Sequence, residues 1–386
     1  MNRRNFIRLS AAAAGAGVAA GSLGSLGTLT SCGSTAGRKK TRSGRMKLSF
    51  KPIMLQMKHV FNISGFSSSE RPSVLVEITY DGITGYGEGG LPPYLIGQNH
   101  ETVQQFLSKI DLEQFSDPFQ LDDILTYVDN IAPGFTSPKS AVDIALHDLI
   151  GKLLDVPTWQ MFGYTAEKAP DTAYTIGIDT EEMIRKKMLE TEPYNIIKVK
   201  LGAPDIEADK MLINTVRSMT DKPIVADANM GWKNKHLALE MIHWIAERGA
   251  LMIEQPLPVN VFDDMAWITE RSPIPTYGDE SCQRLQDVPR LQGIFHGINI
   301  KLIKCTGLYE ARKMISTAEA VGMKVMLGCT TETSCGISAA AQVTPKVDFA
   351  DVDGNLLISN DMFDGIKIVD GKIILNNRPG IGAIPL

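Results

Sequence analysis

Hydrophobic and polar residues alternate with two different patterns along the chain, and the change falls near residue 169. Before it, residues 74–80 alternate in the manner of a strand, followed by the turn signal Asp81-Gly82 and a second short strand over residues 85–88. Residues 138–154 then repeat apolar positions with the helical period, which predicts a helix with one buried face. Residues 46–168 are therefore predicted to form an α+β domain.

After residue 169, short apolar segments alternate with helical patterns of about 10–15 residues, which favours repeated βα units and a parallel sheet. The predicted strands cover residues 172–178, 196–200, 224–227, 251–254, 276–278, 297–301, 324–327 and 349–351. Eight such strands predict an α/β fold with a closed barrel over residues 169–360. Residues 361–386 carry a hairpin signal at Asp370-Gly371, and we expect them to return to the first domain.

Charged residues stand where most of the predicted barrel strands stop. They are Lys200, Asp227, Glu254, Asp279 and Lys301, with Asp351 and Asp353 on the last strand. A single Asp at a strand end more often opens a turn or caps a helix. Charges at successive strand ends are harder to explain in that way, and active sites of such barrels lie at the C-terminal ends of the strands. The sequence therefore predicts that these side chains converge on one site.

Three of these residues, Asp227, Glu254 and Asp279, end adjacent strands and offer hard oxygen ligands to a divalent cation. Mg²⁺ fits this set best, and Mn²⁺ stays open. Because no His stands at these strand ends, the pattern argues against a zinc site.

The lysines Lys200 and Lys301 end the strands on either side of the three carboxylates, so a bound substrate would face one amine on each side. This arrangement suits two-base proton exchange at a carbon beside a carboxylate. A free lysine has a pKa of about 10.4, and we expect the cation and Lys198 to lower it toward neutrality. The alternative is that each lysine forms a structural ion pair with the carboxylates.

Five motifs in a fixed order carry a family resemblance. They are Lys198-Val-Lys200, Asp227-Ala-Asn229, Glu254-Gln255-Pro256, Gly278-Asp279-Glu280-Ser281 and Asn299-Ile300-Lys301. With residues 85–88 and 145–149 of the first domain, the chain resembles the muconate lactonizing enzyme subgroup of the enolase superfamily. The resemblance implies an α+β domain that caps a (β/α)₇β barrel, Mg²⁺ on the three carboxylates, and Lys200 and Lys301 as the acid/base pair.

Members of this subgroup catalyse different reactions, so the fold does not decide the function. Asp351-Val-Asp353 is similar to the motif by which dipeptide epimerases hold the α-ammonium group of the substrate. Two carboxylates suit a zwitterion and would repel a dicarboxylic acid. The alternative is that Asp353 starts the turn at Gly354. The resemblance also assigns substrate contacts to Thr175, Lys198, Cys329 and Thr330.

The expected function is thus Mg²⁺-dependent epimerisation of the C-terminal residue of a dipeptide, with L-Ala-D/L-Glu or a related cell-wall fragment as the leading substrate. The alternatives are an N-acylamino acid racemase or another subgroup reaction, and a lipoprotein that binds peptides without catalysis. In the alanyl-glutamate enzymes an Arg in a capping-domain loop can meet the glutamate side chain, but residues 62–67 here contain none. The nearest is Arg71; its role and the side-chain preference at either dipeptide position stay open, and self-association is an expectation from relatives.

Residues 1–45 do not read as part of the fold. Arg3-Arg4 precede an uncharged apolar run over residues 9–29, which resembles a twin-arginine export signal. Residues 29–32 resemble a lipobox that would place a lipid on Cys32, followed by a basic tether. A transmembrane helix is the alternative. We expect an exported, periplasmic protein that meets the membrane only through this anchor.

Composition adds two exclusions. The chain of 386 residues has a net charge of −5 without a basic stripe, so nucleic acid is not an expected partner. The cysteines other than Cys32 are scattered without metal-ligand or disulfide spacing, and we interpret them as small buried residues.

Overall fold

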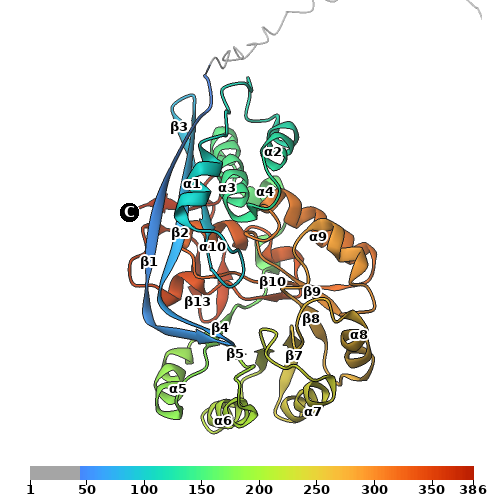
Figure 1. Ribbon diagram of the computed structural model, residues 1–386. Helices are drawn as coiled ribbons and strands as arrows, with labels where there is room; N and C mark the ends of the chain where they lie inside the picture. Colours follow the sequence, from blue (N-terminus) through green and yellow to red (C-terminus); the bar gives the residue numbers. More distant parts are fainter. Residues whose placement is uncertain (1–43) are drawn as a thin grey trace, which may run out of the picture. The chain divides into compact units, whose positions relative to one another are not determined.

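The computed structural model describes residues 44–386 (Figure 1). The predicted export signal, the lipidation site Cys32 and nearly all of the tether lie outside the described residues. Within the described part, every helix is too short or too polar to cross a membrane.

The first domain is built on a three-stranded antiparallel sheet in the order β1-β2-β3. Its elements are β1 (Lys47–Ile63), β2 (Phe66–Tyr80), β3 (Ile83–Gly90), α1 (His100–Leu107), α2 (Leu121–Asn130), α3 (Thr136–Leu154) and α4 (Thr158–Met161). Asp81 and Gly82 join β2 to β3 with φ of 54° and 77°, the left-handed backbone of a tight hairpin turn. The predicted hairpin is confirmed, and we call this sheet with α1–α3 the cap.

Helix α3 packs unusually close to β3, because alternate positions of the strand lack a side chain. A Cβ atom on Gly85 would lie 2.1 Å from the carbonyl oxygen of Ala145, and one on Gly87 would lie 2.0 Å from that of Ala141. Every residue of α3 from Ser137 to Gly151 is buried, whereas the sequence predicted one buried face. The difference arises because α3 contacts the sheet on one side and barrel helix α9 (Leu308–Ala320) on another.

The second part is a parallel sheet of eight strands in the order β4 to β11. The strands are β4 (Ala173–Ile176), β5 (Ile196–Lys200), β6 (Ile224–Asp227), β7 (Ala250–Glu254), β8 (Thr276–Gly278), β9 (Gly297–Ile300), β10 (Lys324–Leu327) and β11 (Phe349–Ala350). A parallel bridge between Thr172 and Ala350 joins the first strand to the last. This is the barrel that the strand pattern predicted.

Helices connect successive strands around the outside of the barrel (Figure 1). They are α5 (Glu181–Met188), α6 (Ile206–Arg217), α7 (Lys235–Ala246), α8 (Phe262–Arg271), α9 (Leu308–Ala320) and α10 (Ser334–Ala341). After β8 the connection is a 3₁₀ helix, η3 (Leu285–Arg290), with Pro289 inside it. Counting η3, seven strand-helix units and a final strand make the (β/α)₇β arrangement that the family resemblance implied.

The C-terminal segment touches both parts. Its strands are β12 (Phe363–Asp364), β13 (Lys367–Val369), β14 (Lys372–Ile374) and β15 (Ile384–Pro385). The predicted turn at Asp370-Gly371 joins β13 to β14, and Gly371 accepts a hydrogen bond from the backbone N–H of Thr172 beside the barrel. The backbone N–H of Ile381 donates to Asp148 of α3. The domain limits at residues 168 and 360 stay predictions.

Two buried carboxylates of the cap bind backbone N–H groups at the starts of barrel helices. Glu88 accepts from the N–H groups of Thr333 and Gly336 at the start of α10. Asp143 accepts from the N–H groups of Leu308 at 2.6 Å and of Tyr309 at 3.2 Å, at the start of α9. Because helix N-termini carry unsatisfied N–H groups and partial positive charge, these carboxylates fix the cap on the rim of the barrel.

We therefore expect the substitution Asp143→Ala to lower the free energy of unfolding by about 3 kcal/mol, since it leaves the buried N–H group of Leu308 and the partly buried N–H group of Tyr309 without an acceptor. Urea denaturation measures this change. The control is Asp123→Ala on the exposed face of α2, which should stay within about 0.5 kcal/mol of the parent. Equal effects of the two substitutions would contradict the docking role of Asp143.

Candidate active site

Strand register sets the predicted site residues at one level of the barrel. Lys200 pairs with Asp227, and Asp227 pairs with Glu254, as the last residues of β5, β6 and β7. Asp279 follows the end of β8, and Lys301 follows the end of β9. The sheet order therefore places the three carboxylates between the two lysines, as the sequence predicted.

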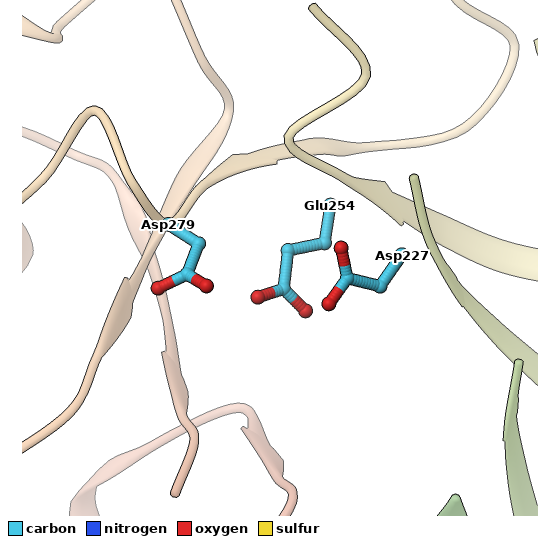
Figure 2. Close-up of side chains that lie close together, drawn as sticks. All are labelled: Asp227, Glu254 and Asp279. Carbon is cyan, nitrogen blue, oxygen red and sulfur yellow. The ribbon is translucent and has the colours of Figure 1, made fainter. Parts of the chain in front are cut away.

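The carboxylates of Asp227, Glu254 and Asp279 gather in one place, and each offers an oxygen within 4.8 Å of the others (Figure 2). All three residues are at most 1% exposed. Burial and then the charge of Asp227 raise the pKa of Glu254, because like charges in a buried site disfavour ionisation. Buried carboxylates at this spacing repel one another, and a cation bound between them would stabilise their charged forms.

The donor set suits Mg²⁺. Its three carboxylates supply hard oxygen ligands, and their spacing is one that a small central cation can bridge. Beside them, the buried oxygens Asn229 Oδ1 and Glu280 Oε2 have no hydrogen-bond partner among the described residues. Unpartnered oxygens are what the hydration shell of a metal ion would satisfy, since Mg²⁺ usually keeps several waters.

Each candidate base is paired with one of the carboxylates. The Nζ atom of Lys200 lies 2.6 Å from Oδ2 of Asp227, and that of Lys301 lies 2.7 Å from Oδ2 of Asp279. Burial lowers the pKa of each lysine, but the adjacent carboxylate raises it, and the net pKa lies above the ordinary value. The carboxylates thus act in the opposite direction from the cation that the sequence analysis considered.

Two further lysines pair with these carboxylates. Lys198 is fully buried and contacts Glu254 and Asp351, each at 2.7 Å. It does not line the cavity described below, although the resemblance assigned it a substrate contact. Lys304, which the sequence analysis missed, donates to a side-chain oxygen of Asp279. The available signal was a lysine three residues after Lys301, beyond the apolar pair 302–303.

The two acids that follow β11 lie beside β4. Asp353 accepts a hydrogen bond of 2.8 Å from the backbone N–H of Thr175, and Asp351 accepts one of 3.4 Å from the Thr175 hydroxyl. Burial and then the charge of Asp351 raise the pKa of Asp353. A positively charged group placed here would therefore be stabilised by both carboxyl groups.

A small cavity joins these groups. The predicted residues Thr175, Lys200, Lys301, Cys329, Thr330, Asp351 and Asp353 line it. Sequence reasoning missed the other lining residues, which are Phe61, Tyr94, Asn229, Thr331, Gly354 and Leu357. Cys329 is partly exposed here, whereas Cys282, Cys305 and Cys335 are buried, as predicted for the cysteines as a group.

The end of the β1–β2 hairpin closes one side of the cavity. The carbonyl oxygen of Asn62 accepts a hydrogen bond from the backbone N–H of Ile178, which follows β4. His59 lies 2.8 Å from Glu190, which also accepts a hydrogen bond from the Tyr174 hydroxyl. These contacts seat the hairpin of the cap on the barrel and bring Phe61 to the site.

Comparison with known families gives two matches. Residues 51–163 match the family described as "Mandelate racemase / muconate lactonizing enzyme, N-terminal domain". Residues 181–385 match the family described as "Enolase C-terminal domain-like".

Individual proteins give the same result. An L-Ala-D/L-Glu epimerase of Bacteroides thetaiotaomicron is 53% identical over 387 residues, which cover 100% of both chains. The structure of a substrate-liganded L-Ala-D/L-Glu epimerase of Bacillus subtilis superposes with a TM-score of 0.83 at 26% identity, covering 88% of this chain and 99% of that one. A dipeptide epimerase of Cytophaga hutchinsonii, complexed with Mg and D-Ala-L-Val, gives 0.82 at 27% identity over 89% and 96%.

Proposed function

Because the chain belongs to the mandelate racemase/muconate lactonizing enzyme family of the enolase superfamily, we propose that it is a Mg²⁺-dependent dipeptide epimerase. It inverts the α-carbon of the C-terminal residue, and L-Ala-D/L-Glu is its leading substrate. The observation that carries this proposal is the placement of Lys200 and Lys301 on either side of a buried carboxylate triad, facing one cavity.

Asp227, Glu254 and Asp279 would hold the metal ion. Bound there, Mg²⁺ supplies positive charge beside the α-carboxylate of the substrate, and this stabilises the negative charge that develops when the α-carbon loses its proton. The hydrogen bonds from Lys198 to Glu254, and from Lys304 to Asp279, hold two of the three ligands in place.

The two lysines move the proton. One amine removes it from one face of the α-carbon, and the ammonium on the other face returns a proton, so the configuration inverts. In the reverse direction the roles exchange. Each lysine is at most 8% exposed, which limits exchange with bulk water during the step.

Asp351 and Asp353 bind the α-ammonium group of the dipeptide. Thr175 fixes both carboxyl groups, since it donates to Asp353 through its backbone and to Asp351 through its hydroxyl. A free amino terminus gains two acceptors here, whereas an N-acyl group would leave Asp353 without a cation, since only Asp351 is paired with Lys198. This contrast favours a dipeptide over an N-acylamino acid.

We further propose that the protein is exported by the twin-arginine route and anchored by a lipid on Cys32. The support lies in the sequence of residues 1–45, which resembles an export signal with a lipobox. The alignment with the Bacteroides thetaiotaomicron enzyme also extends over this segment. Export suits an enzyme whose substrate comes from cell-wall peptides.

We expect the Mg²⁺-loaded protein to incorporate one deuterium into L-Ala-L-Glu in D₂O and to form the L,D epimer. Lys200→Met and Lys301→Met should each abolish epimerisation, because one of the two faces loses its base. One variant should still exchange the proton of the L,L dipeptide and the other that of the L,D dipeptide. Mass spectrometry and ¹H NMR follow both reactions.

Lys187→Met, which removes a buried lysine of α5 that is paired with Asp179, is the matched control and should keep full activity. Chelation by EDTA should stop exchange, and added Mg²⁺ should restore it. Absence of exchange in a set of dipeptides would favour a binding lipoprotein or another subgroup reaction.

The double substitution Asp351→Asn with Asp353→Asn should lower kcat/KM for L-Ala-L-Glu by about 100-fold or more, because the ammonium loses charge-assisted hydrogen bonds. Activity on an N-acylated glutamate should not fall. Asp348→Asn, at the opposite end of β11, is the control. If the double substitution changes kcat/KM equally for the dipeptide and the N-acylated substrate, Asp351 and Asp353 do not bind the amino terminus.

For export, we expect metabolic labelling with a palmitate analogue to mark the full-length protein but not the Cys32→Ala variant. Arg3→Lys with Arg4→Lys should leave the precursor in the cytoplasm, whereas Arg8→Lys, outside the pair, should not. Cell fractionation followed by immunoblotting shows where each variant is located. Unlabelled wild-type protein would exclude the lipid anchor.

A further inference from the structure

Asp209, on α6, is a buried carboxylate that the proposed mechanism does not use. The residue is 1% exposed. Its Oδ2 atom accepts hydrogen bonds from the backbone N–H of Gly202 at 3.0 Å and from Nε1 of Trp232 at 2.9 Å, and its Oδ1 atom accepts one from the backbone N–H of Ala203 at 3.0 Å. Because a buried carboxylate requires such donors, the three bonds tie α6 firmly to the loop after β5 and to the loop after β6.

The turn that Asp209 holds follows Lys200 almost directly. Lys200 is the last residue of β5, and one residue separates it from Gly202. Gly202 has a φ of 83°, in the left-handed region that favours glycine, so the chain turns away from the barrel at this point. The hydrogen bonds from Gly202 and Ala203 fix this turn against α6. The backbone position of Lys200 therefore depends on Asp209.

The loop after β6 contacts the same turn but has a support of its own. A Cβ atom on Gly231 would lie 2.3 Å from the Cα atom of Gly202, so the backbones of the two loops touch. The backbone N–H of Met230 in this second loop also donates to the carbonyl oxygen of Gln255, after β7, at 2.8 Å. Loss of the Asp209 carboxylate should therefore displace the loop after β5 more than the loop after β6.

The second base is held by a separate set of hydrogen bonds. The backbone N–H groups of Lys304 and Cys305 donate to the carbonyl oxygen of Lys301 at 2.9 Å and 3.3 Å. These bonds close a turn within residues 301–305, and neither involves Asp209. The two sides of the site thus have independent supports.

We infer that Asp209 is a positioning residue for Lys200 and has no such role for Lys301. This inference rests on the proposed function, in which the two lysines act on opposite faces of the α-carbon. Proton transfer needs close and well-aligned atoms, and a displacement of about 1 Å can cost about 100-fold in rate. Substitution of Asp209 should therefore slow proton transfer on one face of the substrate and spare the other.

The test variant is Asp209→Asn, which keeps the size of the side chain but only one of its two acceptor oxygens. The Mg²⁺-loaded protein is incubated in D₂O with L-Ala-L-Glu and, separately, with L-Ala-D-Glu. Mass spectrometry and ¹H NMR measure deuterium exchange at the α-carbon and inversion for each epimer. The Lys200→Met and Lys301→Met variants show which epimer presents its proton to which lysine.

For the epimer that faces Lys200, Asp209→Asn should slow exchange and inversion together by about 30-fold, with KM changed by less than about threefold. For the epimer that faces Lys301, exchange with retention of configuration should stay within about threefold of the wild type. Its inversion should fall, because Lys301 still removes the proton but Lys200 no longer delivers one efficiently. The ratio of exchange to inversion therefore rises for this epimer alone.

The matched control is Asp148→Asn on α3. Asp148 is also fully buried, and it accepts hydrogen bonds of 2.9 Å from the backbone N–H groups of Tyr86 and Ile381 and a third from Lys152. This variant should lower the thermal stability, as Asp209→Asn does, but leave the ratio of exchange to inversion unchanged for both epimers.

A second variant, Trp232→Phe, removes one of the three donors to Asp209 and keeps the carboxylate. It should shift the ratio in the same direction by a smaller factor. Thermal unfolding shows whether each variant folds, and if Asp209→Asn does not fold, the ratio measured with Trp232→Phe decides.

An equal fall in exchange for the two epimers would show a general loss of structure and overturn the positioning role, and so would unchanged rates. Either result would leave the epimerase proposal intact. If the wild type exchanges deuterium into neither epimer nor any other dipeptide, the proposed function itself fails and the inference fails with it.

Discussion

The rest of the structure depends on the burial of unlike charges at the mouth of the barrel. Six carboxyl groups lie there, those of Asp227, Glu254, Asp279, Glu280, Asp351 and Asp353, against four lysines, Lys198, Lys200, Lys301 and Lys304. Each lysine lies within 2.7 Å of a carboxylate oxygen. Buried ions are tolerated only when they are paired and hydrogen-bonded. The carboxyl groups outnumber the lysines, and a divalent cation would add positive charge among them.

Such a cluster needs rigid walls, and the loops after the strands supply them. Asn229 and Gln255 have φ of 42° and 38°, in a region that side chains rarely adopt, and each lies within two residues of a triad carboxylate. Gln255 accepts hydrogen bonds from the backbone N–H groups of Asp279 and Ser281, which ties the end of β7 to the loop after β8. At these residues the chain turns sharply away from the end of its strand, and this backbone conformation holds the carboxylates of Asp227 and Glu254 in one position. The cap, held by Glu88 and Asp143, then covers them.

The barrel strands and the charged residues that end them were predictable from the sequence. The same physical reasons explain why other elements and site residues were not. Barrel strands are buried on both faces and read as short apolar runs, and a charge that ends such a run stands out, as Asp227 does. The length of β1 was not predictable, because most of its residues are partly or fully exposed and Pro52 interrupts the pattern. Tyr94 and Phe61 reach the site only through the docking of the cap. No local pattern marks a residue whose role depends on contacts between distant segments.

The raised pKa of the two lysines that we propose as catalysts can be reconciled with a role as a base. Proton abstraction requires a neutral amine, yet Asp227 and Asp279 favour the ammonium forms of Lys200 and Lys301. The oxygens that stabilise the ammonium groups, Oδ2 of Asp227 and Oδ2 of Asp279, belong to the same carboxylates that would coordinate a metal ion. When those carboxylates also face a divalent charge, each lysine shares its acceptor with a competing cation, and the neutral amine becomes more accessible. The pairing that stabilises the charges at the barrel mouth is therefore the one that a bound metal ion would weaken, so a single set of contacts would control both stability and basicity.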